Sequence, residues 1–107
     1  MNKLNKFILV FVSAIALILT STTISFSKVV GDKIILGAAV SLTGKYSTNG
    51  KHTKNGYNLA VERINSKGGV KVGGKSYKFE IIYYDDESNS KRAAQLAERL
   101  IKQDGIK

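Results

Sequence analysis

The chain has 107 residues, enough for one small domain, and it contains no Cys, which excludes disulfides, thiolate metal sites and a cysteine nucleophile. Its formal net charge of +9 comes from basic residues scattered singly along the sequence, a distribution that argues against a nucleic-acid-binding protein. A hydrophobic fraction of 43% excludes wholesale disorder.

The first 27 residues have the pattern of a secretory signal peptide. Lys3 and Lys6 form a positively charged end, and Phe7–Leu19 is a nearly uninterrupted apolar run. Such a run spans about 20 Å as a helix, too short to cross a hydrocarbon core of about 30 Å comfortably. A polar stretch follows, and its small-x-small sequence ending at Ser27 predicts cleavage near that residue.

Because no Cys follows the apolar run, lipid attachment at a new N-terminal Cys is excluded. The expected product is therefore a soluble protein of the bacterial periplasm, starting close to residue 28. The alternative is an uncleaved apolar segment that tethers a ligand-sensing domain to the membrane.

Lys33–Val40 is a nearly continuous apolar run bounded by turn residues, and it predicts a strand buried on both faces. Ser41–Gly50 is rich in Ser, Thr, Gly and Asn and is expected to be a loop. From about Lys51 to Ser66 the apolar residues recur at helical spacing and predict a helix with one apolar face. That face consists of Tyr57, Ala60, Val61 and Ile64.

The second half of the chain repeats this order. Val70–Lys75 is expected to be a turn or a small hairpin, and Tyr77–Tyr84 a second strand. The second helix is expected from about Ser90 to Gln103, with Asn89 as its N-cap because a side-chain oxygen there can accept from a free amide. Strand, helix, strand and helix in this order predict an α/β fold, the start of a doubly wound sheet with two adjacent parallel strands.

Gly69–Ser76 matches the phosphate-loop pattern G-x-x-x-x-G-K-[ST] by its letters alone. A nucleotide-binding enzyme needs a strand before that loop and a helix after it. Here a helix is expected before the segment and a strand after it. The segment is therefore interpreted as a Gly-rich turn, and a nucleotide-binding enzyme is kept as the alternative from another functional class.

Asp85, Asp86 and Glu87 follow the second strand and resemble the acidic Mg²⁺ pocket of phospho-receiver domains. That pocket takes its acidic pair from the first strand of its domain, so helix capping and turn roles are favoured here. His52 is the only His and has no carboxylate cluster near it in the sequence, so no metal site is predicted. No catalytic constellation is visible either.

In open α/β sheets the ligand lies beyond the carboxyl ends of the strands. Ser41–Gly50 leaves the first strand at that edge, and its hydroxyls and amides suit a small polar or anionic ligand. From composition alone, ordinary loop chemistry is favoured over binding. The ligand-binding candidates are Ser41, Thr43, Tyr46 and Asn49.

Residues 33–107 resemble the opening of the branched-chain amino-acid-binding proteins of ABC importers. No single motif decides this, but the spacing LTG…G…G..LA…IN..GG, followed by DD, is specific as a set. The residues that carry the resemblance are Gly37-Ala38, Ser41-Leu42-Thr43-Gly44, Gly50, Gly56, Leu59-Ala60, Ile64-Asn65, Gly68-Gly69, Asp85-Asp86, Ala93-Ala94 and Leu100.

This resemblance implies a two-lobed periplasmic binding protein whose type I lobes have a Rossmann- or flavodoxin-like sheet and close on the ligand by a hinge. It implies a protein that is not an enzyme, needs no cofactor, and delivers a branched-chain amino acid or related small polar solute to an ABC permease in the inner membrane. Ser and Thr hydroxyls and backbone amides would hold the amino-acid carboxylate, and a carboxylate of the other lobe would hold the ammonium group.

Residues 28–107 would then be the N-terminal part of the first lobe, with most of the site beyond residue 107. Asn49 departs from the family pattern, because the residue before the glycine at this position is often aromatic and covers the ligand. An amide or urea is therefore the alternative solute. A sheet of two strands is marginal, so residues 28–107 alone are not expected to form a stable monomer.

Overall fold

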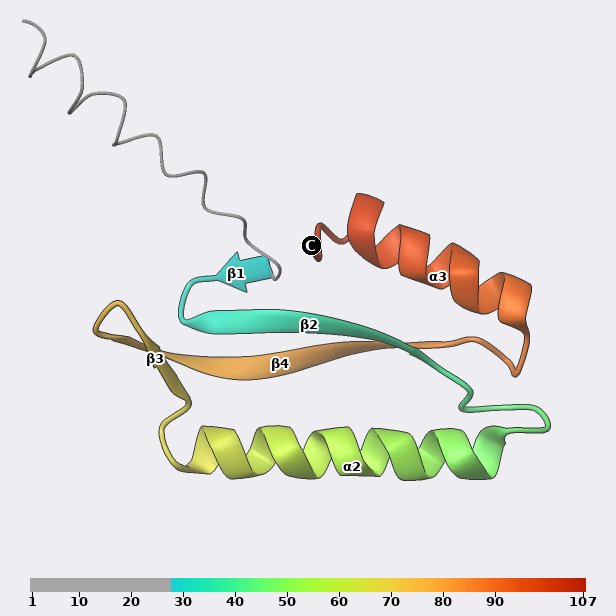
Figure 1. Ribbon diagram of the computed structural model, residues 1–107, viewed down its shortest axis with the longest axis horizontal. Helices are drawn as coiled ribbons and strands as arrows, with labels where there is room; N and C mark the ends of the chain where they lie inside the picture. The colour runs from blue at the N-terminus through green and yellow to red at the C-terminus, as the bar shows by residue number, and fades with distance from the viewer. Residues whose placement is uncertain (1–27) are drawn as a thin grey trace, which may run out of the picture.

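The structure is a computed structural model that describes residues 28–107. The predicted signal peptide and its cleavage near Ser27 lie outside the described residues. Within them, no helix is both long enough and apolar enough to span a membrane. The elements in chain order are β1 (Lys28–Val30), β2 (Lys33–Val40), α2 (Ser47–Ser66), β3 (Val70–Val72), β4 (Lys75–Asp85) and α3 (Ser90–Lys102) (Figure 1).

The centre of the sheet is the parallel pair β2 and β4, as the order of elements predicts. The pairing runs from Lys33 opposite Lys78 to Val40 opposite Asp85, and the strand order is β1-β2-β4-β3. The two carboxyl ends therefore lie side by side at one edge of the sheet. This is the edge at which ligands bind in open α/β sheets.

The sheet has two short antiparallel strands beyond the expected pair, so the prediction of two strands was incomplete. β1 folds back along the start of β2, with Val29 opposite Ile34. β3 forms a small hairpin with β4, with Val70 opposite Tyr77, which confirms the hairpin expected around Val70–Lys75. Both additions lie at the end of the sheet away from the carboxyl edge.

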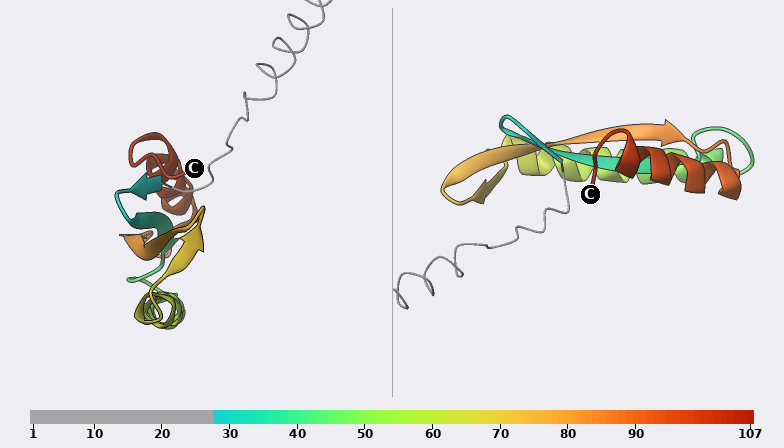
Figure 2. Two further views of the ribbon diagram at one scale, coloured as in Figure 1. Left: turned by 90° about the vertical axis from the view of Figure 1, so that its left-hand side faces the viewer. Right: turned by 90° about the horizontal axis from the view of Figure 1, so that it is seen from above.

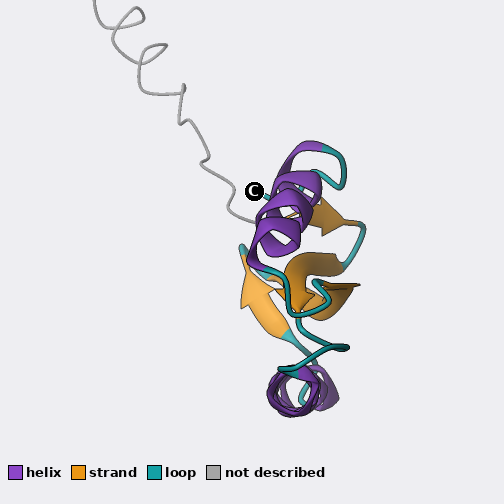
Figure 3. Ribbon diagram, turned by 90° about the vertical axis from the view of Figure 1, so that its right-hand side faces the viewer, coloured by secondary structure: helices purple, strands orange, loops and turns teal. Residues whose placement is uncertain are grey.

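The two helices lie on opposite faces of the sheet, as the end-on views in Figure 2 (left) and Figure 3 show. Alternation along β2 explains the arrangement, because successive side chains of a strand point to opposite faces. Leu36 and Ala38 face α2. Gly37 faces α3, where a Cβ atom would lie 2.7 Å from a methyl group of Leu100. Helices on both faces of a parallel pair confirm the predicted α/β class.

The described residues bury few apolar side chains. Those that are buried are Ile35, Val40, Leu96 and Leu100, each still 6–8% exposed. On the α2 side, the predicted apolar face of the helix is turned towards the sheet, and a cavity of about 270 Å³ lies between them. Tyr57, which lines this cavity, remains 48% exposed. The α3 face is thus packed, whereas the α2 face is loosely covered.

The end of α2 is tied to β4 through two residues of the IN..GG segment. The side-chain amide of Asn65 donates to the carbonyl oxygen of Phe79 and accepts from the amide of Phe79, both at 2.8 Å. Asn65 thereby satisfies a stretch of β4 that β3 does not reach. Gly69 has φ +84° and passes so close to Tyr77 that a Cβ atom would lie 1.9 Å from its carbonyl oxygen.

The segment with the phosphate-loop pattern contains no helix start. Gly69 follows α2, Gly73 and Gly74 form the hairpin turn with φ of +58° and +80°, and Ser76 lies in β4. The amine of Lys75 lies over the ring of Tyr77, 5.1 Å from its centroid. The structure therefore confirms the interpretation of this segment as a turn followed by a strand.

Candidate functional site

Two loops meet where β2 and β4 end. The amide of Leu42 donates to the carbonyl oxygen of Val40 at 3.0 Å, and the amide of Asp86 donates to the same oxygen at 3.1 Å. The β2–α2 loop and the β4–α3 loop therefore start from one shared acceptor at the carboxyl edge of the sheet.

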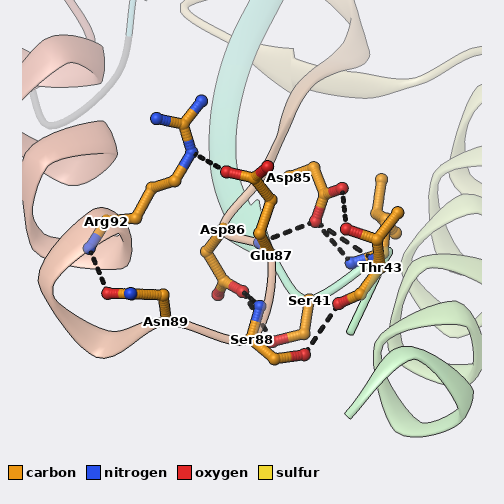
Figure 4. Close-up of polar contacts among 9 residues, drawn as sticks. Ser41, Thr43, Asp85, Asp86, Glu87, Ser88, Asn89 and Arg92 are labelled. Carbon is orange, nitrogen blue, oxygen red and sulfur yellow. Dashed lines mark hydrogen bonds and ion pairs between the residues drawn. The ribbon is translucent and has the colours of Figure 1, made fainter. Parts of the chain in front are cut away.

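Asp85 holds the β2–α2 loop in place (Figure 4). One of its carboxylate oxygens accepts from the amides of Leu42 at 2.9 Å, Thr43 at 3.2 Å and Glu87 at 2.9 Å. The other accepts from the Thr43 hydroxyl at 2.7 Å. The bond from the Thr43 hydroxyl, aided by the amide of Glu87, lowers the pKa of the Asp85 carboxyl from 3.8 to about 2.

We expect this carboxylate to make the stability of the protein sensitive to acid. A group whose pKa is lower in the folded state stabilises the fold above its unfolded pKa, and this stabilisation is lost as the pH falls through the folded pKa. For Asp85 the window lies between pH 3.8 and about 2. The Asp85→Asn variant should melt at a lower temperature than the wild type at pH 7, and the difference should shrink towards pH 2.

Glu87→Gln is the matched control for this experiment, because it removes a neighbouring charge that makes only an exposed ion pair, with Arg92 at 2.5 Å. Its melting temperature should follow the wild type across the same pH range. A difference between Asp85→Asn and the wild type that stayed constant from pH 7 to pH 2 would contradict the assigned role of Asp85.

Asp86 connects the same two loops from the inside and is only 8% exposed. Its Oδ1 atom accepts from the Ser41 hydroxyl at 2.6 Å and from the amide of Ser88 at 2.8 Å. The Ser88 hydroxyl in turn donates to the carbonyl oxygen of Thr43 at 2.7 Å and accepts from the amide of Tyr46 at 3.0 Å. Hydrogen bonds in both directions therefore connect the β2–α2 and β4–α3 loops at the carboxyl edge, and we call them the cross-braced loops.

The acidic triplet was expected to serve helix capping and turn chemistry, and the structure confirms the turn. Asn89 also caps α3 as predicted, its side-chain oxygen accepting from the amide of Arg92 at 3.0 Å. Bridging by Asp85 and Asp86 to the first loop was not predicted. Among residues 28–107, no three His, Cys, Asp or Glu side chains lie together in a way that could hold a metal ion.

A groove of about 350 Å³ opens beside this pair of loops. Three of the four predicted ligand-binding residues line it, namely Ser41, Tyr46 and Asn49. Thr43 does not, because its hydroxyl points to Asp85. The other lining residues are Ala39, Val40, Gly50, Thr53, Tyr57 and Asp86.

The expected loop Ser41–Gly50 is shorter than predicted, because α2 begins at Ser47 rather than near Lys51. Asn49 therefore lies in the first turn of a helix, where it faces the groove. Helical spacing from Asn49 leads to Thr53 and Tyr57, which lie four and eight residues later and line the same groove. With the correct helix start, the sequence would have identified both.

Two comparisons with known proteins bear on this arrangement. Residues 33–107 match the family described as periplasmic binding protein. The fold also resembles a solved structure from Silicibacter pomeroyi, described as a branched-chain amino acid ABC transporter, with 30% sequence identity and a TM-score of 0.59. The match covers 68% of this chain but 18% of that one, so the chain spans less than a fifth of the length of the solved protein.

Proposed function

Because the chain belongs to the periplasmic binding protein family, we propose that it is the solute-binding component of an ABC importer. In this proposal it works in the periplasm after removal of the predicted signal peptide. It captures a branched-chain amino acid or a related small polar solute and presents it to a permease in the inner membrane. The similarity of this chain to the Silicibacter pomeroyi protein supports an amino acid as the solute.

The observation that carries this proposal is the groove at the carboxyl edge of the parallel pair. Ser41, Tyr46 and Asn49 meet there, and a ligand-sized space of about 350 Å³ is open beside them. The cross-braced loops hold this surface before any ligand arrives, which lowers the entropy lost on binding. A preformed polar groove of this kind suits reversible capture and requires no chemical reaction.

We further propose that residues 28–107 form the first part of one lobe of a longer, two-lobed protein. The groove is open, and half of the Tyr46 side chain is exposed. A second lobe closing over this edge would bury the ligand, as hinged binding proteins do. The short span of the match within the solved relative supports this division.

Calorimetric titration of the full-length protein tests the function directly. We expect saturable one-to-one binding of at least one solute among Leu, Ile, Val, acetamide and urea. Tyr46→Ala should weaken that binding about tenfold or more, because truncating a well-placed aromatic residue in a binding site typically has this effect. Tyr77→Ala is the control, since Tyr77 lies at the opposite end of β4.

The titration also separates the two solute classes. Binding of amides or urea without binding of Leu, Ile or Val would assign the protein to the alternative solute class. That class was suggested by Asn49, which stands where the family often has an aromatic residue. Failure of all five solutes to bind would contradict the proposed function.

A further inference from the structure

The part of the groove lined by Ser41 and Thr53 offers hydrogen-bond acceptors, whereas the side chains of Tyr46, Asn49 and Tyr57 elsewhere in the lining carry donors. The Ser41 hydroxyl donates its proton to Asp86, so only its lone pairs remain for a ligand. Thr53 is in the same position, because its hydroxyl donates to the carbonyl oxygen of Asn49 at 3.0 Å. Two hydroxyls that could have donated to a carboxylate are therefore already committed.

Asp86 adds the decisive acceptor. Both hydrogen bonds to its side chain end on Oδ1, and within residues 28–107 no donor reaches Oδ2. No buried polar side-chain atom of the described part lacks a partner, so Oδ2 keeps a path to solvent. Asp86 lines the groove and is otherwise buried, so we infer that its unbonded oxygen is the atom that faces the groove.

We propose that Asp86 is a specificity-determining residue whose free oxygen, with Ser41 and Thr53, selects an N–H donor on the solute, an ammonium or amide group. This inference rests on the proposed function. It reverses the assignment that the family resemblance implies for these loops, where hydroxyls would hold a carboxylate. A ligand carboxylate placed beside Asp86, Ser41 and Thr53 would face a second carboxylate and two hydroxyls whose protons are already donated.

The first turn of α2 is the competing feature, because the positive end of a helix dipole favours an anion. That end is equivalent to about half an elementary charge, and its effect falls off within the first turn. Asp86 places a full negative charge in the same groove. The balance of charge at the groove therefore favours a cationic or N–H-bearing group.

The Asp86→Asn variant of the full-length protein tests this inference with little disturbance of the loops. The Asn oxygen can still accept from Ser41 and Ser88, while its NH₂ group replaces the free oxygen and donates instead. With L-leucine as the probe, or acetamide and urea if leucine does not bind, we expect the affinity to fall about tenfold to a hundredfold. Glu87→Gln should leave the affinity unchanged.

The sign of the change distinguishes the two orientations of the solute. If a ligand carboxylate faced Asp86, removal of the negative charge would tighten binding. Unchanged or tighter binding by Asp86→Asn, in a protein whose wild type binds the probe, would overturn this inference and leave the proposed function intact. No binding by the wild type would overturn both.

Thr53→Val gives a second, independent measurement should Asp86→Asn not fold. Thr53 lies on α2, away from the cross-braced loops, and Val has nearly the same shape without the acceptor. We expect several-fold weaker binding of the same probe. Wild-type affinity in a folded Thr53→Val protein would count against an acceptor-lined site.

Discussion

Replacing Gly50 with Ala should destroy the folded carboxyl edge of the sheet and abolish solute binding by the full-length protein. A Cβ atom at this position would lie 1.7 Å from the carbonyl oxygen of Ser41 and 2.5 Å from its carbonyl carbon. Both are backbone atoms, so no side-chain rotation relieves the overlap. Either α2 or the β2–α2 loop would have to move, and we expect a loss of at least about 3 kcal/mol of unfolding free energy.

Gly56→Ala is the matched control for this prediction, because Gly56 lies in the same helix with no atom within 4 Å of a Cβ. Ala is favoured over Gly inside helices, so this variant should gain up to about 1 kcal/mol. Urea denaturation measures both effects, and titration with the solute measures the loss of the site. Similar unfolding free energies for the two variants would show that the close approach of α2 to Ser41 is wrong.

The β-α-β-α order was predictable because each element has a strong local signal. Lys33–Val40 is apolar almost throughout, as expected for a strand with a helix on each face. The apolar positions of α3 recur at helical spacing, and Asn89 marks its start. These signals depend on near neighbours in the sequence, which is why they survive without any knowledge of tertiary contacts.

The short strands carry no comparable signal. β1 and β3 have three residues each, too few for a pattern of alternation, and they are strands only because longer strands lie beside them. The start of α2 was misplaced for a related reason. Its N-cap is Tyr46, without a capping side-chain hydrogen bond, and Gly50 resembles a loop residue although it serves the close approach to Ser41.

The candidate site was predictable in part for the same reason. Ser41, Tyr46 and Asn49 follow the first strand directly, so the rule that ligands bind at the carboxyl edge identifies them. Asp86 lies 45 residues from Ser41 in the chain, and only the parallel register brings the two together. Thr43 has a hydroxyl in the correct loop, but this hydroxyl donates to the Asp85 carboxylate instead of facing the groove. The sequence does not reveal that contact.

Residues 28–107 produced alone should not unfold cooperatively. Within them, three of the four buried apolar side chains, Ile35, Leu96 and Leu100, belong to the face between α3 and the sheet. On the other face, a cavity of about 270 Å³ lies between the sheet and α2, and Leu59 and Ile64 of this helix remain 50% and 36% exposed. A small core of this kind cannot offset the conformational entropy of about eighty residues.

Circular dichroism during urea titration tests this prediction, with the full-length protein as the control. We expect a broad, featureless change for residues 28–107 and binding of a hydrophobic dye to the exposed α2 face. The full-length protein should give a sigmoidal transition, because further chain would cover that face. A sharp transition of residues 28–107 would contradict the prediction. It would mean that residues 28–107 fold stably although the α2 face is loosely covered. The stability argument for a longer, two-lobed protein would then fail.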